Sequence, residues 1–96
     1  MKSRDDILAL LRREKDALMA QWPIARLSLF GSVARNQHTP TSDVDLLVDI
    51  TQPMGFRFFD LIAQFEALLG EPVDLVERDQ IRPEAWPYIE QDVIDV

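Results

Sequence analysis

The sequence contains no cysteine, and its 96 residues include only one histidine, His38. A chain without cysteine has no disulfide, no thiol nucleophile and no thiolate metal site, which fits a reducing cytosol. His38 lies in a polar stretch with no second histidine, so the sequence supports no Ser–His–Asp relay. We interpret His38 as a residue of a surface loop.

Basic residues are also scarce. Ten lysines and arginines stand against 17 aspartates and glutamates, which gives a formal net charge of −7. A strongly acidic surface repels phosphate backbones, so we do not expect direct binding of nucleic acid. Such acidity suits divalent cations or a basic protein partner, and it is equally well explained as charge that keeps the protein in solution.

Long hydrophobic runs are absent too. Charged residues interrupt the short apolar stretch near the N-terminus within a few positions, so the sequence predicts neither a signal peptide nor a membrane span. We expect a cytoplasmic protein that has no membrane partner. The chain contains no internal repeat, and its length predicts one domain over residues 1–96.

Apolar periodicity predicts two amphipathic helices, over residues 3–21 and 56–69, and three short strands, over residues 25–30, 43–50 and 73–77. The strand over residues 43–50 is apolar on both faces at its centre, as in a central strand that is covered on two sides. This order of elements predicts an α/β (α+β) domain with a small three-stranded mixed sheet and flanking helices.

The C-terminal segment that begins at Ile81 carries three large apolar residues, Trp86, Tyr88 and Ile89. We expect this segment to cap the core as a short helix.

Asp43 and Asp45 are two residues apart on a predicted strand, so both carboxylates point to one face, with Cα atoms roughly 6.5 Å apart. Like charges this close repel each other unless a cation lies between them or one is protonated. Hard oxygen ligands at this spacing suit Mg²⁺. With 11 aspartates in the chain, about one such pair arises by chance, but this pair opens the most buried strand, where unpaired charge is costly.

Asp74 is an isolated acid in the apolar strand Pro-Val-Asp-Leu-Val. A buried carboxylate needs a hydrogen-bond donor, a charged partner or a metal. If this strand lies beside that of Asp43 and Asp45, the three carboxylates converge on a site for one or two metal ions. The alternative is an edge-strand residue that faces water.

Gly31 and Ser32 follow a predicted strand and precede a predicted helical turn. Junctions of this kind bind phosphate through backbone N–H groups, with the glycine allowing close approach and the serine adding a hydroxyl. Arg35, one turn later, could reach phosphate oxygens or form a structural ion pair with an aspartate. The sequence leaves both roles of Arg35 open.

Residues 31–48, GSVARNQHTPTSDVDLLV, combine these features. The segment resembles the G-S-x10-D-x-D signature of the polymerase-β-like nucleotidyltransferase superfamily, and in particular its MNT branch of minimal nucleotidyltransferases. Asn36 departs from the pattern, which usually has glycine there, but asparagine tolerates left-handed backbone conformations. The chain lacks the extra helical domain with which larger relatives bind an acceptor. The acceptor surface would then come from a partner or from a second copy in a homo-oligomer.

The resemblance implies a nucleotidyltransferase fold and a role for each residue. Asp43 and Asp45 would bind one or two Mg²⁺ ions that carry ATP, while Asp74 would complete the metal site and help deprotonate the attacking hydroxyl. Gly31 and Ser32 would hold the terminal phosphates, and Arg35 is a further candidate for phosphate contact. The implied reaction transfers AMP from ATP and releases pyrophosphate.

The resemblance also implies a partner. MNT proteins are commonly antitoxins of HEPN-domain toxins, and some adenylylate a tyrosine of the toxin. Two alternatives stay open: an antitoxin that neutralises its HEPN partner by binding alone, and a small-molecule nucleotidyltransferase of the aminoglycoside-modifying kind. The sequence does not distinguish ATP from other nucleotides.

Overall fold

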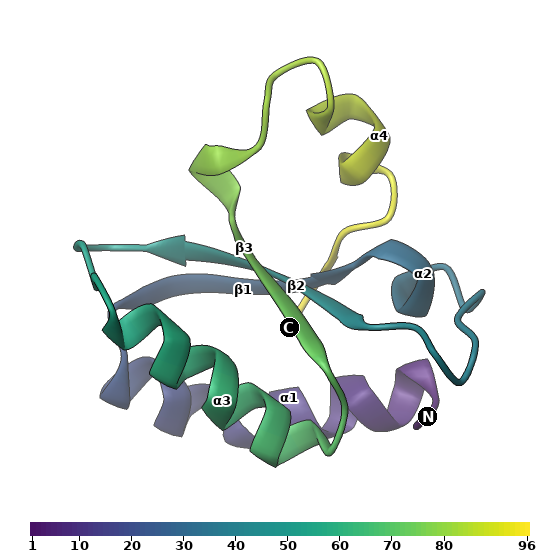
Figure 1. Cartoon of the computed structure of the whole chain (residues 1–96), viewed down its shortest axis with the longest axis horizontal. Helices are drawn as coiled ribbons and strands as arrows, with labels where there is room; N and C mark the ends of the chain where they lie inside the picture. Colours follow the sequence, from purple (N-terminus) through teal and green to yellow (C-terminus); the bar gives the residue numbers. More distant parts are fainter.

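The computed structural model describes all 96 residues, with the two long helices packed on one face of a four-stranded sheet (Figure 1). The elements in chain order are α1 (Arg4–Gln21), β1 (Ile24–Phe30), α2 (Gly31–Ala34), β2 (Val44–Ile50), α3 (Arg57–Leu69), β3 (Val73–Glu77), the 3₁₀-helix η1 (Arg78–Gln80), α4 (Trp86–Glu90) and β4 (Ile94–Asp95). The strand order is β3-β2-β1-β4. β1 runs antiparallel to both β2 and β4, whereas β3 runs parallel to β2. The expected mixed sheet with flanking helices is therefore confirmed, with one short strand more than predicted.

Local capping residues determine where α1 begins and where α3 ends. The Ser3 hydroxyl accepts a hydrogen bond of 3.1 Å from the backbone N–H of Asp6, which caps the first turn of α1. At the end of α3, Gly70 adopts the left-handed conformation at φ 65°, which a residue with a Cβ atom adopts only with strain. None of the helices is long and apolar enough to span a membrane.

The core lies between the sheet and the pair formed by α1 and α3, which cover the same face (Figure 1). Phe65 of α3 is the largest side chain that is fully buried. In β2, Leu46 and Val48 belong to this core, while Leu47 points to the opposite face and is nevertheless fully buried. The prediction that the centre of this strand is buried on both faces is therefore confirmed.

The C-terminal segment differs from the expectation. It does form the helix α4, but α4 buries none of its residues, and Tyr88 is 76% exposed. The chain then returns to the sheet, where Ile94 and Asp95 pair with β1 as the fourth strand. The tail thus adds its last strand to the sheet edge, and Ile94 and Val96, not α4, pack against the core.

Strand alternation places the polar residues of the sheet on the face away from α1 and α3. Asp45 lies between Phe30 of β1 and Asp74 of β3 in the strand register. Farther along the same face, Asp49 of β2 is paired with Arg26 of β1. The candidate residues are therefore on the face away from α1 and α3, at the end where β1 finishes and β2 and β3 begin.

Candidate functional site

Asp45 is the centre of the site, because the parallel pairing of β2 and β3 places Asp74 directly beside it. Neighbouring strands lie about 4.8 Å apart, so side chains at paired positions on one face are close neighbours. Asp43 comes just before β2, which begins one residue later than the sequence predicted, at Val44. The Val44 N–H donates to the Pro72 carbonyl at 2.8 Å and fixes this corner of the sheet.

The three acids differ in burial. Asp45 is half-buried, whereas Asp43 and Asp74 are exposed. Asp74 is therefore exposed at the sheet edge and not buried as expected, but its strand does lie beside β2, which was the condition for the three carboxylates to converge. Asp74 owes its place in the site to its position beside Asp45, not to burial.

The acids interact electrostatically. Burial, followed by the negative charges of Asp74 and Asp43, raises the pKa of Asp45 from 3.8 to about 6, and the nearby Arg35 partly offsets this by lowering it. Both burial and the neighbouring acids penalise the ionised form of Asp45. A cation bound among the three carboxylates would remove the repulsion, so the site favours a positively charged ligand.

These donors suit Mg²⁺, which prefers carboxylate and phosphate oxygens together with water. The structure contains no group of three His, Cys, Asp or Glu side chains already arranged to bind a metal ion. Asp43 and Asp74 are exposed, whereas Asp45 is half-buried with its carboxylate against the Gly31 backbone. Asp43, Asp45 and Asp74 therefore offer the carboxylate oxygens that a hard cation such as Mg²⁺ would require.

Gly31 starts α2 immediately after β1, at φ 73°. A Cβ atom added there would overlap the Asp45 carboxylate oxygen Oδ2 and lie 2.9 Å from its Cγ atom. Only glycine allows the backbone to lie against this carboxylate. The contact brings Gly31 and the half-buried Ser32 into the same site as the acids.

The turn after α2 is held at both ends. The Arg4 guanidinium donates to the Ala34 carbonyl at 3.3 Å, and the Gln37 N–H donates to the Ser32 carbonyl at 2.8 Å. Asn36 has φ 59°, a left-handed conformation that asparagine tolerates in place of the usual glycine. His38 follows in the loop before β2 and is half-buried.

Arg35 forms the ion pair that was one of its two predicted roles. Its Nη1 atom donates to Asp92 Oδ2 at 2.7 Å, and its Nε atom donates to Gln37 Oε1 at 3.1 Å. No local pattern identifies Asp92 as the partner, because the two residues are far apart in the chain. The ion pair leaves the Arg35 side chain 44% exposed, so the phosphate role stays a prediction.

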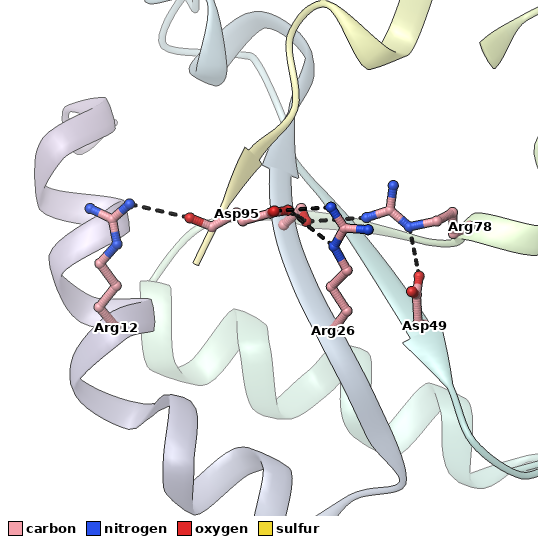
Figure 2. Close-up of polar contacts among 6 residues, drawn as sticks. Arg12, Arg26, Asp49, Arg78 and Asp95 are labelled. Carbon is pink, nitrogen blue, oxygen red and sulfur yellow. Dashed lines mark hydrogen bonds and ion pairs between the residues drawn. The ribbon is translucent and has the colours of Figure 1, made fainter.

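A second polar cluster, on the face of the sheet away from α1 and α3, binds the C-terminal strand to β1 (Figure 2). Arg26 donates to both carboxylate oxygens of Asp95, at 3.3 and 2.9 Å, and the buried Ser28 donates to Oδ1 at 2.6 Å. Arg78 donates to Ser28 at 3.2 Å and to Asp49 at 2.7 Å. Sequence reasoning missed this cluster, since its members come from three strands and η1 with no local pattern.

Ser28→Ala is expected to lower the free energy of unfolding by about 1–2 kcal/mol, because Asp95 and Arg78 each lose a hydrogen-bond partner. Urea denaturation would measure the change. Thr51→Ala, at an exposed position, serves as the control and should change stability by less than about 0.5 kcal/mol. Equal stabilities for the Ser28→Ala and Thr51→Ala variants would contradict this account of the cluster.

The surface hollows of the structure lie away from the three acids. One is on α1, lined by Lys2, Asp6 and Arg13 among others. The other two are at the far ends of β2 and β3, around Asp49 and Arg78 and around residues 50–53. The carboxylate site is therefore an open surface and not a closed cavity.

The sequence matches the family described as nucleotidyltransferase domain over residues 11–95. The Methanocaldococcus jannaschii protein MJ0128 is 38% identical over 98 residues, which cover all of both chains. The protein adenylyltransferase MntA of Thermococcus cleftensis is 34% identical over 83 residues, which cover 85% of this chain and 84% of MntA. These matches span the fold and the site together.

Solved structures show the same fold. One described as a minimal nucleotidyltransferase superposes with a TM-score of 0.77 at 27% identity, covering 99% of this chain and 97% of the other. A Shewanella oneidensis complex of a tri-AMPylated HEPN toxin with an MNT antitoxin has a chain that matches with a TM-score of 0.57 at 18% identity, covering 96% of this chain and 66% of the other. The chain belongs to the nucleotidyltransferase domain family, and it is a nucleotidyltransferase.

Proposed function

We propose that this protein transfers AMP from ATP to a tyrosine hydroxyl of a HEPN toxin and so acts as its antitoxin in the cytoplasm. The observation that carries the proposal is the placement of Asp45 between Asp74 and the Gly31 backbone, with Asp43 beside it. The relative MntA is named a protein adenylyltransferase, and the Shewanella complex pairs an AMPylated HEPN toxin with an MNT antitoxin.

Each residue has a role in the proposed reaction. The tyrosine oxygen attacks the α-phosphorus of ATP, the bond to the β-phosphate breaks, pyrophosphate leaves, and the proton passes to the Asp74 carboxylate. Gly31 and Ser32 hold the terminal phosphates and keep the leaving group in line with the attacking oxygen. Asp43, Asp45 and Asp74 would hold one or two Mg²⁺ ions, which supply positive charge to the phosphates.

The open surface of the site supports a protein acceptor. A small-molecule acceptor needs a pocket that buries most of its surface, whereas the hollows of this chain lie away from the acids. A protein partner supplies the remaining walls when it docks. A second copy of this chain could supply the same surface in a homo-oligomer.

The proposal is tested by incubating the protein with ATP labelled at the α-phosphate, Mg²⁺ and a HEPN protein encoded beside it. We expect label on the HEPN protein, at tyrosine, and no label from ATP labelled at the γ-phosphate. Neutralisation of the toxin without ATP, and by the Asp43→Ala/Asp45→Ala variant, would support the binding-only alternative instead. Labelled aminoglycoside with an unlabelled protein would support the small-molecule alternative.

A further inference from the structure

Asp92 lies in the segment between α4 and β4 and reaches back to the residue that follows α2. Its side chain is 18% exposed, against 44% for the Arg35 side chain with which it pairs at 2.7 Å. The acid is thus enclosed by the fold, and the guanidinium is the more open of the two groups. No role in the reaction described above requires Asp92.

Two contacts fix the Arg35 guanidinium. One Nη1 hydrogen bond goes to Asp92 and the Nε hydrogen bond goes to Gln37. A guanidinium has five N–H groups, so three N–H groups remain available for another ligand. Arg35 is the C-cap residue of α2, one turn after Gly31, and its backbone N–H donates to the Gly31 carbonyl at 3.1 Å.

We propose that Asp92 is a positioning residue that holds Arg35 with its remaining N–H groups towards the triphosphate of the bound nucleotide. This inference rests on the proposed function and adds to it a residue from the C-terminal tail. An arginine side chain that is not held by another residue loses rotamer entropy when it binds phosphate. The ion pair with Asp92 orders the side chain beforehand, so nucleotide binding does not bear that cost.

Asp92→Asn keeps the shape of the side chain but removes its charge. We expect this variant to raise the Kd for the ATP analogue AMP-PNP with Mg²⁺, and the KM for ATP, by about 10-fold, with kcat within about twofold. Asp92→Glu should restore part of the affinity. In an Arg35→Ala background, Asp92→Asn should have no further effect, because the two residues act as one unit.

Asp95→Asn is the matched control. Asp95 is the other tail acid paired with an arginine, and it holds the tail to β1 without contacting Arg35. This variant should lower stability but leave the Kd for AMP-PNP within about twofold of the wild-type value. Calorimetric titration gives the Kd values, and denaturant unfolding shows how far each variant loosens the tail.

Three results would overturn the proposal. An equal rise in Kd in the Asp92→Asn and Asp95→Asn variants would mean that tail docking alone matters. Tighter binding by Asp92→Asn would mean that Asp92 competes with phosphate for Arg35. Loss of affinity that persists without Arg35 would assign the effect to another contact.

Nucleotide binding and AMP transfer by the wild-type protein test the role of Asp92 and the proposed function separately. Nucleotide binding without AMP transfer would contradict the proposed function and leave the Asp92 comparison valid. A wild-type protein that binds no nucleotide would overturn both.

Discussion

Asp45→Asn is expected to lower AMP transfer by at least ~1000-fold and, at the same time, to raise the free energy of unfolding by about 1 kcal/mol. Transfer falls because the central carboxylate of the site loses its charge. Stability rises because the pKa of Asp45 is raised to about 6 by burial and by the charges of Asp74 and Asp43, so the ionised form destabilises the fold. The half-exposed position of Asp45 keeps the gain small.

The gain in stability depends on pH in a defined direction. Below about pH 3.8 the Asp45 carboxyl is protonated in both the folded and the unfolded protein, and it has no effect on stability. Between pH 3.8 and about 6 only the unfolded chain releases this proton, so the contribution of Asp45 to stability declines as pH rises. Above about pH 6 the cost is complete, and there the Asp45→Asn substitution should give its full gain.

Asp49→Asn is the control for Asp45→Asn, because Asp49 lies on the same face of the same strand but pairs with Arg78. This control should lower stability and leave transfer within about threefold. Unfolding at about pH 7.5, above the raised pKa of Asp45, and transfer of α-labelled AMP would be measured on both variants. An Asp45→Asn variant that loses stability, or that still transfers AMP, would contradict the assigned role.

Gly31→Ala is expected to lower transfer by more than about 100-fold and to destabilise the fold by about 2–4 kcal/mol. The added Cβ atom meets the Asp45 carboxylate, and alanine is strained at φ 73°. The carboxylate cannot move away without leaving its place between the Gly31 backbone and Asp74. The substitution therefore displaces the Gly-Ser turn and the central acid together.

The Gly55→Ala variant separates the effect of backbone strain from the effect of the overlap with Asp45. Gly55 also has positive φ, at 57°, but a Cβ atom there would meet nothing within 4 Å. Backbone strain alone should cost about 1 kcal/mol at this position, with transfer unchanged. If Gly31→Ala behaves like Gly55→Ala in both stability and transfer, the close approach of Gly31 to Asp45 has no functional role.

The features that the sequence predicted correctly have a local cause. The apolar spacing of α1 and α3 and the stop at Gly70 determine the long helices. Strict alternation placed Arg26, Ser28 and Phe30 on one face of β1, away from the core residues Leu27 and Leu29. The Gly31-Ser32 turn and the Asp43-x-Asp45 pair share one short segment, and the resemblance of that segment to the nucleotidyltransferase signature is what suggested a common site.

The features that the sequence did not predict depend on contacts between distant segments. β4 has only two residues, which is too short for an alternation of apolar and polar residues that could predict a strand. Asp92 and Asp95 are two of 11 aspartates, and only the return of the tail to β1 brings them to Arg35 and Arg26. The exposure of Asp74 follows from the place of β3 at the sheet edge, which residues 73–77 alone do not reveal.

We propose that Asp43, Asp45 and Asp74 act as one site for a divalent cation and a nucleotide. Titration of Mn²⁺ in the presence of AMP-PNP, followed by electron paramagnetic resonance, tests it on the wild-type protein and on each Asp→Asn variant. Each of the three substitutions is expected to weaken Mn²⁺ binding by at least about 10-fold, while Asp49→Asn should leave it unchanged. Unchanged Mn²⁺ binding in the Asp74→Asn variant, or equal loss in Asp49→Asn, would contradict it.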